Sequence, residues 1–370
     1  MKAIVIGCGW MGTAVAWAMH KLGYELALVE PDGNRREEAQ HKFKSLGMPQ
    51  PTWCAFPDYR WSTFPNRDVD VVVSCAPYRS NLDYAKNCRV YGFRYCDLGG
   101  NPEVSQAIKQ YALENKNPTV FTDLGLAPGY INILAEEVAE KVDRLYTINL
   151  YVGGLPQEKQ NRIGYNMVFS VDGLLNEYTG ECDILHQGRI QQVLSLRGVQ
   201  RLGAQHEAFY TRGGIGSTLE SMKVRGVANC SYRTIRYAGH CEYVRFLMED
   251  SGLYRKNTEF TTTLRDIFTH ACPPTKDDLV HMLIKYAILT KQGQLVSTIK
   301  SNESWTAMQI GTAFPAAAVA AMMAKGRFDD KSVATYADVN VAKCKELLRT
   351  IDSDVPWDLQ EVPEGAGLCL

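Results

Sequence analysis

The sequence predicts an α/β protein in two parts: a doubly wound parallel sheet, followed by an α+β domain with a mostly antiparallel sheet. Three observations predict this. Strands and helices alternate from residue 2 to about residue 123. The first of these elements enclose a glycine-rich turn. From about residue 145, apolar and polar residues partly alternate, which suits an antiparallel sheet with one covered face.

The first thirty residues follow the order strand, glycine turn, helix, strand, acid. Lys2–Ile6 is an apolar run typical of a buried parallel strand. It leads into the turn G-C-G-W-M-G at 7–12, and a helix is expected over 13–22. A second strand is expected over 25–29, directly before Glu30. This order is that of a dinucleotide-binding βαβ unit, the start of a Rossmann domain.

Each part of this unit has a physical role. Gly7 permits the tight turn, Gly9 leaves room for a pyrophosphate, and Gly12 lets the helix pack closely on the strand. The free N–H groups at the helix N-terminus then face the anion. Glu30 can accept hydrogen bonds from the adenosine ribose and would repel a 2′-phosphate. We therefore expect NAD rather than NADP, although two arginines close behind Glu30 could meet a phosphate.

Length and composition narrow the classes of protein. At 370 residues the chain is too long for one compact core, so two domains are expected. A formal net charge of -1 argues against nucleic-acid and anionic-membrane partners. No apolar run is expected to span a membrane, and the start leaves no room for a signal peptide, so a cytoplasmic location is expected. The 11 cysteines contain no CxxC pair and the histidines are unclustered, so neither a disulfide framework nor a metal site is expected.

The rest of the first domain continues the alternation. Helices are expected over 34–46, 81–91 and 103–115, and strands over 69–75, 93–97 and 119–123. The loops at the carboxyl ends of parallel strands line the ligand crevice of an open sheet. That rule places Ser74, Cys75, Pro77 and Tyr78 near a bound cofactor.

The character of the chain changes near residues 125–129. Beyond them we expect strands over 145–152, 188–196, 230–237, 279–289 and 295–300, and helices over 130–141, 242–249, 262–269, 304–325 and 339–350. Pro315 should bend or restart its helix. The dinucleotide-binding domain is therefore assigned to 1–128, to which the helices of about 303–350 return. The substrate-binding and oligomerisation domain is assigned to 129–302, and the tail over 356–370 is expected to be loosely ordered.

A further set of stretches stands out in order along the chain. They are Asp123–Gly129 with Asn132, Tyr151–Pro156, Phe169–Tyr178, Glu207–Gly214, Ile235–His240, and Trp305–Gln309 with Gly311 and Pro315–Ala317. Together with the glycine turn they resemble the saccharopine dehydrogenase family, most of all its short lysine 6-dehydrogenase branch. The resemblance covers most of residues 1 to about 325. One departure is Ala238, where the family pattern has proline.

The resemblance implies an NAD(P)-dependent oxidoreductase that acts at a carbon–nitrogen bond of lysine or a lysine adduct. It also implies a homo-oligomer, here expected to be a homodimer. In lysine 6-dehydrogenation a hydride leaves the ε-carbon while the amine becomes an imine, which water then hydrolyses. Such a site needs a neutral amine, a proton acceptor, and groups that hold the substrate carboxylate and amine.

Four residues are candidates for catalysis: Tyr78, Asp97, Asp123 and His240. Tyr78 could exchange a proton or merely stack on the cofactor. The two aspartates end adjacent strands and could face the substrate amine, or could cap the next helix or turn. His240 titrates near the working pH range but could equally make a structural hydrogen bond. The candidate cofactor contacts are Gly7, Gly9, Trp10, Met11, Gly12, Glu30, Cys75, Ala76, Pro77, Leu98 and Gly129.

The candidate substrate contacts are Asn132, Glu177, Thr211 and Arg212. Asn132 could hydrogen-bond substrate or cofactor, or cap its own helix. Glu177 could bind an ammonium group, or could be a solvated carboxylate at a helix end. Thr211 and Arg212 precede a pair of glycines, a flexible turn suited to a substrate carboxylate.

Two alternatives remain open. The enzyme could run in reverse and reduce an imine, as saccharopine reductase or carboxynorspermidine dehydrogenase does. The extra carboxylates of such a substrate could meet arginines of the second domain: Arg197, Arg201, Arg225, Arg233, Arg236 and Arg245. Alternatively, the chain could bind NAD(H) without turnover, as a sensor or scaffold.

Overall fold

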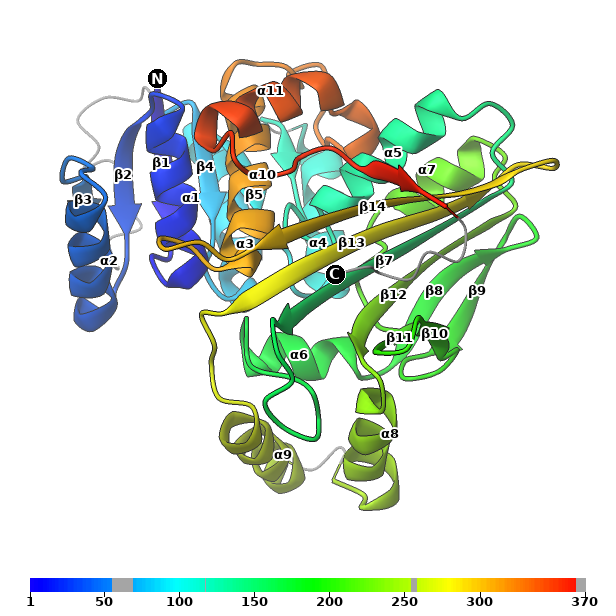
Figure 1. The fold of residues 1–370 in the computed structure, drawn as a ribbon. Coiled ribbons are helices and arrows are strands. Elements are labelled where there is room, and N and C mark those ends of the chain that lie inside the picture. Colours follow the sequence, from blue (N-terminus) through cyan, green and yellow to red (C-terminus); the bar gives the residue numbers. More distant parts are fainter. Residues whose placement is uncertain (55–68, 117, 254–257, 364–370) are drawn as a thin grey trace. The chain divides into compact units, whose positions relative to one another are not determined.

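The computed structural model describes residues 1–54, 69–116, 118–253 and 258–363 (Figure 1). The chain divides into two compact units. Unit 1 comprises Met1–Leu134 and Gln309–Trp357, and unit 2 comprises Ala135–Met308 and Asp358–Leu370. The sequence placed the corresponding boundaries near residues 128 and 303. In the structure the first boundary lies between Leu134 and Ala135, inside the helix that follows Gly129.

The described part of unit 1 holds a parallel sheet of six strands in the order β3-β2-β1-β4-β5-β6. These strands are β1 (Lys2–Ile6), β2 (Glu25–Val29), β3 (Thr52–Cys54), β4 (Val71–Ser74), β5 (Arg94–Asp97) and β6 (Val120–Phe121). All of their pairings are parallel. The strand order reverses between β1 and β4, the switch point at which ligands bind in such sheets. The predicted doubly wound sheet is confirmed, and β3 is an addition to it.

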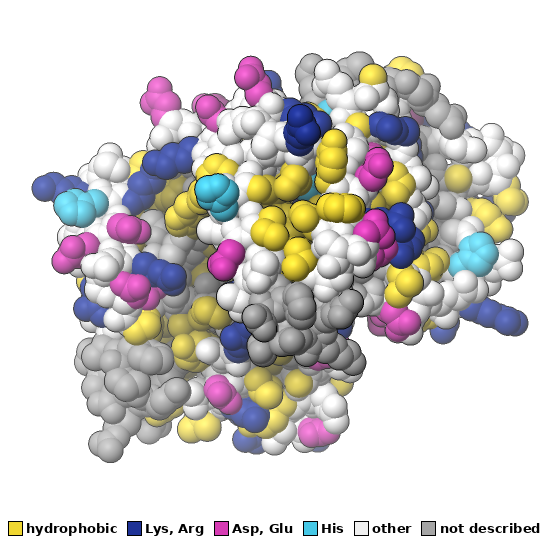
Figure 2. Space-filling model, turned by 90° about the horizontal axis from the view of Figure 1, so that it is seen from below, with side chains coloured by type: hydrophobic (Ala, Val, Ile, Leu, Met, Phe, Trp, Pro, Cys, Tyr) yellow, Lys and Arg dark blue, Asp and Glu magenta, His cyan; other side chains and the backbone are white. Residues whose placement is uncertain are grey.

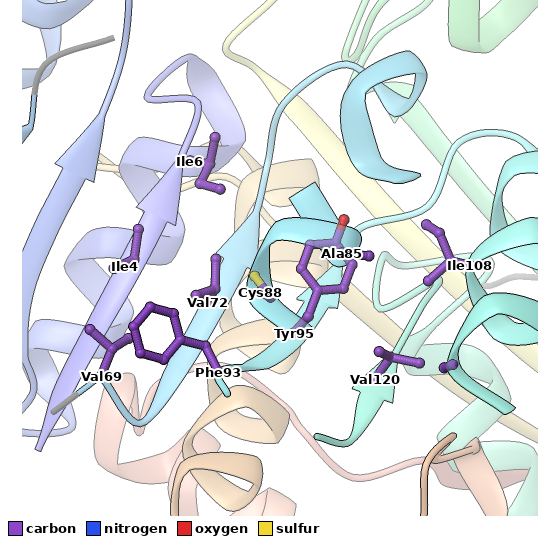
Figure 3. Close-up of a cluster of buried hydrophobic side chains, with 11 residues drawn as sticks. Ile4, Ile6, Val69, Val72, Ala85, Cys88, Phe93, Tyr95, Ile108 and Val120 are labelled. Carbon is purple, nitrogen blue, oxygen red and sulfur yellow. The ribbon is translucent and has the colours of Figure 1, made fainter. Parts of the chain in front are cut away.

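Helices cover this sheet, and their buried faces form the core. They are α1 (Trp10–Lys21), α2 (Gly33–Ser45), α3 (Asn81–Tyr91), α4 (Pro102–Asn115), α11 (Val341–Ile351), and parts of α5 (Tyr130–Lys141) and α10 (Ala307–Ala324). Figure 3 shows one core cluster, in which Ala85 and Cys88 of α3 and Ile108 of α4 pack with Ile4, Val72 and Tyr95 of the sheet. This packing fixes the carboxyl ends of β1, β4 and β5, where the candidate residues lie.

Helix α10 bears on two expectations. It continues through Pro315 as one helix, so the helix does not restart there. A proline removes one backbone donor, and the neighbours Phe314 and Ala316, both 0% exposed, keep the helix packed around it. By length and composition α10 is also the one helix among the described residues that could cross a membrane, yet 94% of it is buried inside the structure. That burial is typical of a core helix.

Unit 2 is built on a mixed sheet, described as nine strands. The strand order is β10-β11-β12-β7-β13-β14-β15, and β8 pairs with β12 and β9. The strands are β7 (Thr147–Pro156), β8 (Glu181–His186), β9 (Arg189–Leu194), β10 (Gln200–Leu202), β11 (His206–Tyr210), β12 (Asn229–Tyr237), β13 (Asp278–Ala287), β14 (Gln292–Lys300) and β15 (Gln360–Val362). Only β7 and β12 pair in parallel. The mostly antiparallel sheet is therefore confirmed.

Four helical segments accompany this sheet: α6 (Val171–Glu177), α7 (Thr218–Val224), α8 (His240–Arg245), which continues as a π-helical turn over Phe246–Asp250, and α9 (Thr258–Ala271). The expected helix over 242–249 therefore begins earlier and changes its winding. The tail is ordered further than expected, because β15 pairs antiparallel with β14. Residues 364–370 of that tail lie outside the described residues.

The surface carries no block of one charge on the face seen in Figure 2. Acidic and basic side chains are interspersed there, with hydrophobic side chains between them. This mixture agrees with the formal net charge of -1.

Candidate cofactor and substrate sites

The glycine turn between β1 and α1 is shaped by close contacts. Gly7 has a φ of +84°, and a Cβ there would lie 2.9 Å from the backbone nitrogen of Ala76. A Cβ at Gly12 would lie 1.6 Å from the carbonyl oxygen of Gly7. At Gly9 a Cβ would meet nothing within 4 Å. The fold itself therefore requires the first and third glycines, whereas the second faces open space.

The N-terminus of α1 leaves its backbone donors available. No side chain caps the helix at Gly9, and its first turn holds no acidic residue. By contrast, the side chain of Asp32 caps α2. Trp10 and Met11 open α1, and the Trp10 carbonyl accepts a hydrogen bond from the Gln309 side chain at 2.8 Å. An uncapped helix N-terminus beside an open turn suits a phosphate group.

Glu30 follows β2 and is tied to the glycine turn. Its Oε2 accepts a hydrogen bond from the Cys8 backbone at 2.8 Å, and its Oε1 accepts one from the Asp32 backbone at 3.0 Å. The residue is 3% exposed. Each carboxylate oxygen keeps a second lone pair for a ribose hydroxyl. The residue thus fits its predicted role while also bracing the turn.

The loop after β4 lies against this turn. The Cys75 backbone donates to the Ile6 carbonyl at 2.7 Å, which joins the start of the loop to the end of β1. The chain then passes Pro77 into a short 3₁₀ helix over Tyr78–Ser80. A Cβ at Gly100 would lie 3.4 Å from Cδ1 of Tyr78, so the tyrosine ring packs on that glycine. The structure thus places the predicted loop beside the glycine turn.

The thiols beside the turn are not nucleophiles. Burial first, and the charge of Glu30 second, raise the pKa of Cys8 to about 12. Burial likewise raises the pKa of Cys75 well above its ordinary value. Both thiols therefore stay protonated near neutral pH, as small packing residues do.

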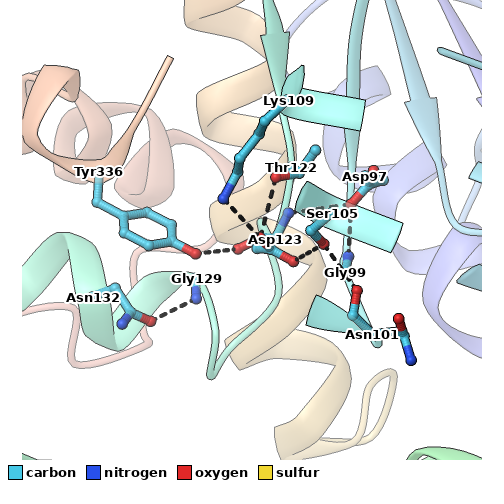
Figure 4. Close-up of polar contacts among 10 residues, drawn as sticks. All are labelled: Asp97, Gly99, Asn101, Ser105, Lys109, Thr122, Asp123, Gly129, Asn132 and Tyr336. Carbon is cyan, nitrogen blue, oxygen red and sulfur yellow. Dashed lines mark hydrogen bonds and ion pairs between the residues drawn. The ribbon is translucent and has the colours of Figure 1, made fainter. Parts of the chain in front are cut away.

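Asp97 and Asp123 are brought together as the sequence predicts. The Asp123 backbone N–H donates to Oδ1 of Asp97 at 3.1 Å, and Gly99 donates to the same oxygen at 2.8 Å (Figure 4). Oδ2 of Asp97 is buried and makes no well-formed hydrogen bond among the described residues, while the Tyr95 hydroxyl interacts with this carboxyl group. Burial first, and the charge of Asp123 second, raise the pKa of Asp97 to about 7. Asp97 can therefore exchange a proton near neutral pH.

Asp123 is fully engaged with its surroundings. Its carboxylate accepts hydrogen bonds from Ser105, from Thr122 at 3.1 Å and from the Lys109 ammonium at 3.3 Å. Its backbone carbonyl accepts a hydrogen bond from the Tyr336 hydroxyl at 2.9 Å (Figure 4). All three partners of the carboxylate are side chains, so Asp123 does not cap the next helix or turn. The capping alternative instead describes Asp97, whose Oδ1 accepts from two backbone N–H groups.

Asn132 also takes the capping arrangement. Its Oδ1 accepts a hydrogen bond from the Gly129 backbone at 2.7 Å, and the residue is 0% exposed. Gly129 has a φ of +141°, and a Cβ there would lie 1.9 Å from the Gly125 carbonyl. The Leu98 carbonyl lies close as well, 3.0 Å from where a Cβ of Gly125 would stand. These contacts hold the loop before α5 tightly closed.

In unit 2, His240 belongs to a buried chain of hydrogen bonds. Its Nδ1 lies 2.9 Å from the Ile163 carbonyl, and its Nε2 lies 2.8 Å from the Tyr178 hydroxyl. The Tyr178 oxygen accepts from Nε of Arg236 at 3.1 Å. Burial first, and the charge of Arg236 second, lower the pKa of His240 to about 3. The expectation that His240 titrates near the working pH is therefore wrong, because the residue is buried beside a cation.

Glu177 lies at the end of α6 and faces Arg236. Its Oε2 is 3.5 Å from Nη2 of Arg236, and the Glu177 side chain is 24% exposed. That oxygen has no hydrogen-bond partner among the described residues. Burial raises the pKa of Glu177 to about 7, although the charge of Arg236 opposes the rise. Glu177 is therefore an accessible carboxylate with a cation behind it.

Of the other predicted substrate residues in unit 2, Arg212 contacts the segment that carries Glu177, and Thr211 has a different hydrogen-bond partner. The Arg212 backbone donates to the Glu177 carbonyl at 2.9 Å, and its side chain donates to Asn176 at 3.4 Å. Thr211 is buried, and its hydroxyl lies 2.6 Å from that of Thr234. The structure thus groups Glu177 with Arg212, whereas Thr211 points into a buried threonine pair.

Sequence reasoning missed the importance of Tyr178 and Arg236. A signal was present, since Tyr178 directly follows Glu177, and Arg236 and His240 share one of the quoted stretches. Alternation along β12 places Arg236 on the same face as Thr234. Arg236 was considered only as a carboxylate ligand, whereas the structure pairs it with a carboxylate of its own chain.

The comparisons with known proteins agree with this geometry. The family model described as the saccharopine dehydrogenase C-terminal domain matches residues 125–353. The chain belongs to the saccharopine dehydrogenase family. This finding confirms the resemblance at the level of the family.

Similarity to a solved structure shows the fold. The apo, histidine-tagged saccharopine dehydrogenase (L-Glu forming) from Saccharomyces cerevisiae aligns with a TM-score of 0.70 and 14% identity, over 98% of this chain and 99% of that one. GenD2 from gentamicin A biosynthesis, in complex with NAD, aligns with a TM-score of 0.46 and 9% identity, over 98% and 96%. Levoglucosan dehydrogenase, in complex with NADH and levoglucosan, aligns with a TM-score of 0.41 and 12% identity, over 98% and 100%. The family member described here thus shares the fold of the yeast enzyme along its whole length.

Proposed function

We propose that this family member is an NAD-dependent oxidoreductase that oxidatively removes the ε-amine of lysine, or of a lysine-like amine. The observation that carries the cofactor half is the open space at Gly9 in front of the uncapped N-terminus of α1. When bound there, NAD would accept a hydride from the carbon that bears the amine. Membership of the saccharopine dehydrogenase family supports chemistry at a carbon–nitrogen bond.

Two carboxyl groups support the amine half of the proposal. Glu177 offers a partly exposed carboxylate, which would bind the cationic amine of the substrate. Asp97 has a buried Oδ2 without a well-formed hydrogen bond among the described residues, and its pKa is raised to about 7, which suits a group that accepts a proton near neutral pH. Tyr78, which packs on Gly100, remains the alternative proton acceptor.

The surroundings of Glu30 support NAD over NADP. Arg36 donates to the Glu30 carbonyl at 2.8 Å and lies over the Trp53 ring at 5.5 Å. Arg35 pairs with Asp32 at 3.8 Å. Both arginines that could have met a 2′-phosphate therefore have other partners, and the Glu30 carboxylate would repel that phosphate.

A substrate panel tests the proposed reaction. Purified protein is mixed with NAD and, separately, with lysine, ornithine, saccharopine or carboxynorspermidine, and NADH formation is followed. Turnover with lysine supports the proposal. Binding of NADH without turnover of any compound would instead indicate the sensor or scaffold.

A glutamate variant tests the cofactor site separately. Glu30→Ala should raise the Kd for NAD at least tenfold, because the ribose loses its acceptor and the turn loses its brace. The control is Glu25→Ala at the start of β2, the strand that Glu30 follows, where the side chain is exposed and pairs with Lys2. Equal NAD affinity in the Glu30 variant and the wild type would contradict the ribose assignment.

One observation favours imine reduction as a second candidate. Arg233 is 7% exposed, and it donates hydrogen bonds to the Gly198 carbonyl and to the hydroxyls of Ser231 and Tyr210, none of them a carboxylate. It could receive a carboxylate of a larger substrate. Other arginines that were considered already pair with glutamates: Arg197, Arg225, Arg236 and Arg245. Turnover with saccharopine but not with lysine would favour this candidate.

We also propose a homodimer in the cytoplasm. The proposal rests on the family resemblance for the dimer and on the scattered cysteines, which form no CxxC pair, for the location. Light scattering of the purified protein tests the oligomeric state, and a mass equal to one chain would contradict it. Fractionation of the source cells tests the location.

A further inference from the structure

The hydrogen-bond chain through His240 has a single possible direction. A guanidinium group can only donate, and a backbone carbonyl can only accept. Arg236 therefore donates to the Tyr178 oxygen, and Tyr178 donates to Nε2 of His240. His240 in turn donates from Nδ1 to the Ile163 carbonyl. Because Arg236 can only donate and the Ile163 carbonyl can only accept, the position of each proton between them is determined. The hydrogen bonds therefore hold Tyr178 and Arg236 in one orientation.

Arg236 is enclosed on its remaining sides. Its Nη1 donates to the Ile235 carbonyl at 3.0 Å, and its guanidinium carbon lies 4.8 Å from the centre of the Tyr165 ring. The residue is 2% exposed, so it cannot itself reach a ligand. Its Nη2 points to Glu177, whose side chain is accessible. The guanidinium group can therefore act on a ligand only through Glu177.

Glu177 keeps one carboxylate oxygen available for a ligand. Oε2 is buried and faces Arg236 at 3.5 Å, which is long for a hydrogen bond. The exposed 24% of the side chain therefore leaves Oε1, and not Oε2, for a ligand. Burial raises the pKa of Glu177 to about 7, and the charge of Arg236 opposes this rise and favours the carboxylate. In its charged form the partly exposed carboxylate attracts an alkylammonium group.

Among the charged groups around Glu177, Arg236 is the one that lowers its pKa, against the larger effect of burial. The hydroxyls of Tyr165, Tyr178 and Tyr232 all interact with Glu177, and burial raises the pKa of each well above neutral, so they stay uncharged. On the side of α6 and α9, Asp172 and Arg265 pair with each other. Arg212 meets Glu177 through its backbone.

We propose that Tyr178 and His240 are positioning residues, which hold Arg236 behind Glu177 so that Glu177 binds the alkylammonium group of the substrate. The inference rests on the proposed function for the identity of the substrate as lysine. It extends that function by assigning the recognition of the amine to Glu177 and by giving the buried histidine a supporting role.

Tyr178→Phe tests this inference. The variant removes the one hydroxyl that links Arg236 to His240 and keeps the ring that packs near Phe209 and Phe268. We expect the KM for lysine to rise about tenfold, because Arg236 is no longer held behind Glu177. The pH dependence of KM should shift toward higher pH, because Glu177 loses a cation that favours its charged form. The kcat and the Kd for NAD should stay within about threefold of wild type.

The matched control is Tyr237→Phe on the same strand as Arg236. The Tyr237 hydroxyl donates to backbone carbonyls, 3.0 Å from that of Pro156 and 3.1 Å from that of Gln157, and takes no part in the chain. A lowered Tm with an unchanged KM in this control would show how a merely structural hydroxyl behaves. If Tyr178→Phe does the same, the inference is overturned.

Direct binding separates this inference from the proposed function. Calorimetry measures the Kd of lysine and of 1,5-diaminopentane for wild type, Tyr178→Phe and Glu177→Gln. Weaker binding to both variants supports the inference even if the wild type turns over no lysine, in which case only the proposed function fails. Absence of binding to the wild type, or equal binding to Glu177→Gln, overturns the inference. If Tyr178→Phe does not fold, Glu177→Gln alone tests the inference, because the side chain of Glu177 is partly exposed and its substitution should be tolerated.

Discussion

At Gly9, an added methyl group should affect the binding of the cofactor without affecting the stability of the fold. Its φ of −69° is open to any residue, and a Cβ there meets nothing within 4 Å. Gly9→Ala should therefore leave the Tm unchanged and raise the Kd for NAD at least tenfold, because the methyl group would occupy the space for the pyrophosphate. Thermal melting and NAD titration measure the two effects. Unchanged NAD affinity would show that the phosphate does not bind at this turn.

Asp97 illustrates how burial changes the behaviour of a carboxyl group. Its folded pKa of about 7 lies above the value of about 3.9 in an unfolded chain. The folded state therefore favours the proton, and the contribution of Asp97 to stability is lost as the pH rises from about 4 through 7. Asp97→Asn cannot ionise, so we expect it to be more stable than the wild type at pH 8 by roughly 1–3 kcal/mol.

Urea unfolding at pH 5 and pH 8 measures this difference. The gain in free energy of unfolding should be larger at pH 8 than at pH 5. Asp123→Asn provides the contrast, since it removes the partner of Lys109 and should destabilise the protein at both pH values. A gain for Asp97→Asn that does not depend on pH would contradict the assigned titration.

At the scale of elements, two buried histidines on different strands of the second sheet make the protein sensitive to acid. His206 on β11 and His281 on β13 have ring centres 5.7 Å apart, and both residues are buried. Burial lowers the pKa of His206, and burial with the charge of His206 lowers the pKa of His281 to about 3. Both are thus held neutral, so stability is present above about pH 6.5 and is lost as the pH falls toward 3.

His206→Phe should flatten this acid limb. The phenyl ring can keep the stack on Tyr237, which has a centroid distance of 5.1 Å. Nε2 of His206 has no hydrogen-bond partner among the described residues, so the substitution breaks no hydrogen bond at that atom. The free energy of unfolding should fall less between pH 7 and pH 4 than in wild type, measured by urea titration. The exposed His186→Gln is the control, and an equal effect there would refute the assignment.

The elements that were predicted share one property: a strong local pattern. β1, β2 and β4 are apolar or β-branched runs that need no partner to be recognised, and α5 agrees at both ends. The missed elements are short or polar, as with α6 and α7 of seven residues each and β10 and β15 of three. Their stability comes from pairing and packing with distant segments, which no local pattern records.

At the scale of the molecule, unit 1 is assembled from two distant parts of the chain. The free edge of β6 is closed by the segment after α10: the Val120 N–H donates to the Ser332 carbonyl at 3.0 Å. The Phe121 ring lies between those of Phe328 and Tyr336, at 6.0 and 5.8 Å. The N-terminal segment alone would therefore expose both a strand edge and part of its core.

We expect a fragment of residues 1–134 to melt without cooperativity and to bind NAD weakly. A chain in which a flexible linker joins 134 to 309–357 should recover a cooperative transition, because it restores the cover of β6. Circular dichroism during heating and NAD titration measure both properties. Cooperative melting and full NAD affinity of the short fragment would show that the C-terminal helices are dispensable for the first unit.

The sequence by itself determined the parts that depend on neighbouring residues. The glycine turn, its helix and Glu30 lie within thirty residues, and their geometry follows from local sterics and backbone hydrogen bonds. The adjacency of Asp97 and Asp123 also followed, since parallel strands end at one edge. Only the tertiary structure decided the ionisation of Asp97, Glu177 and His240. Their pKa values depend on burial and on groups that are distant in the sequence. For His240, the charge of Arg236 lowers the pKa and the hydrogen bond to the Ile163 carbonyl raises it.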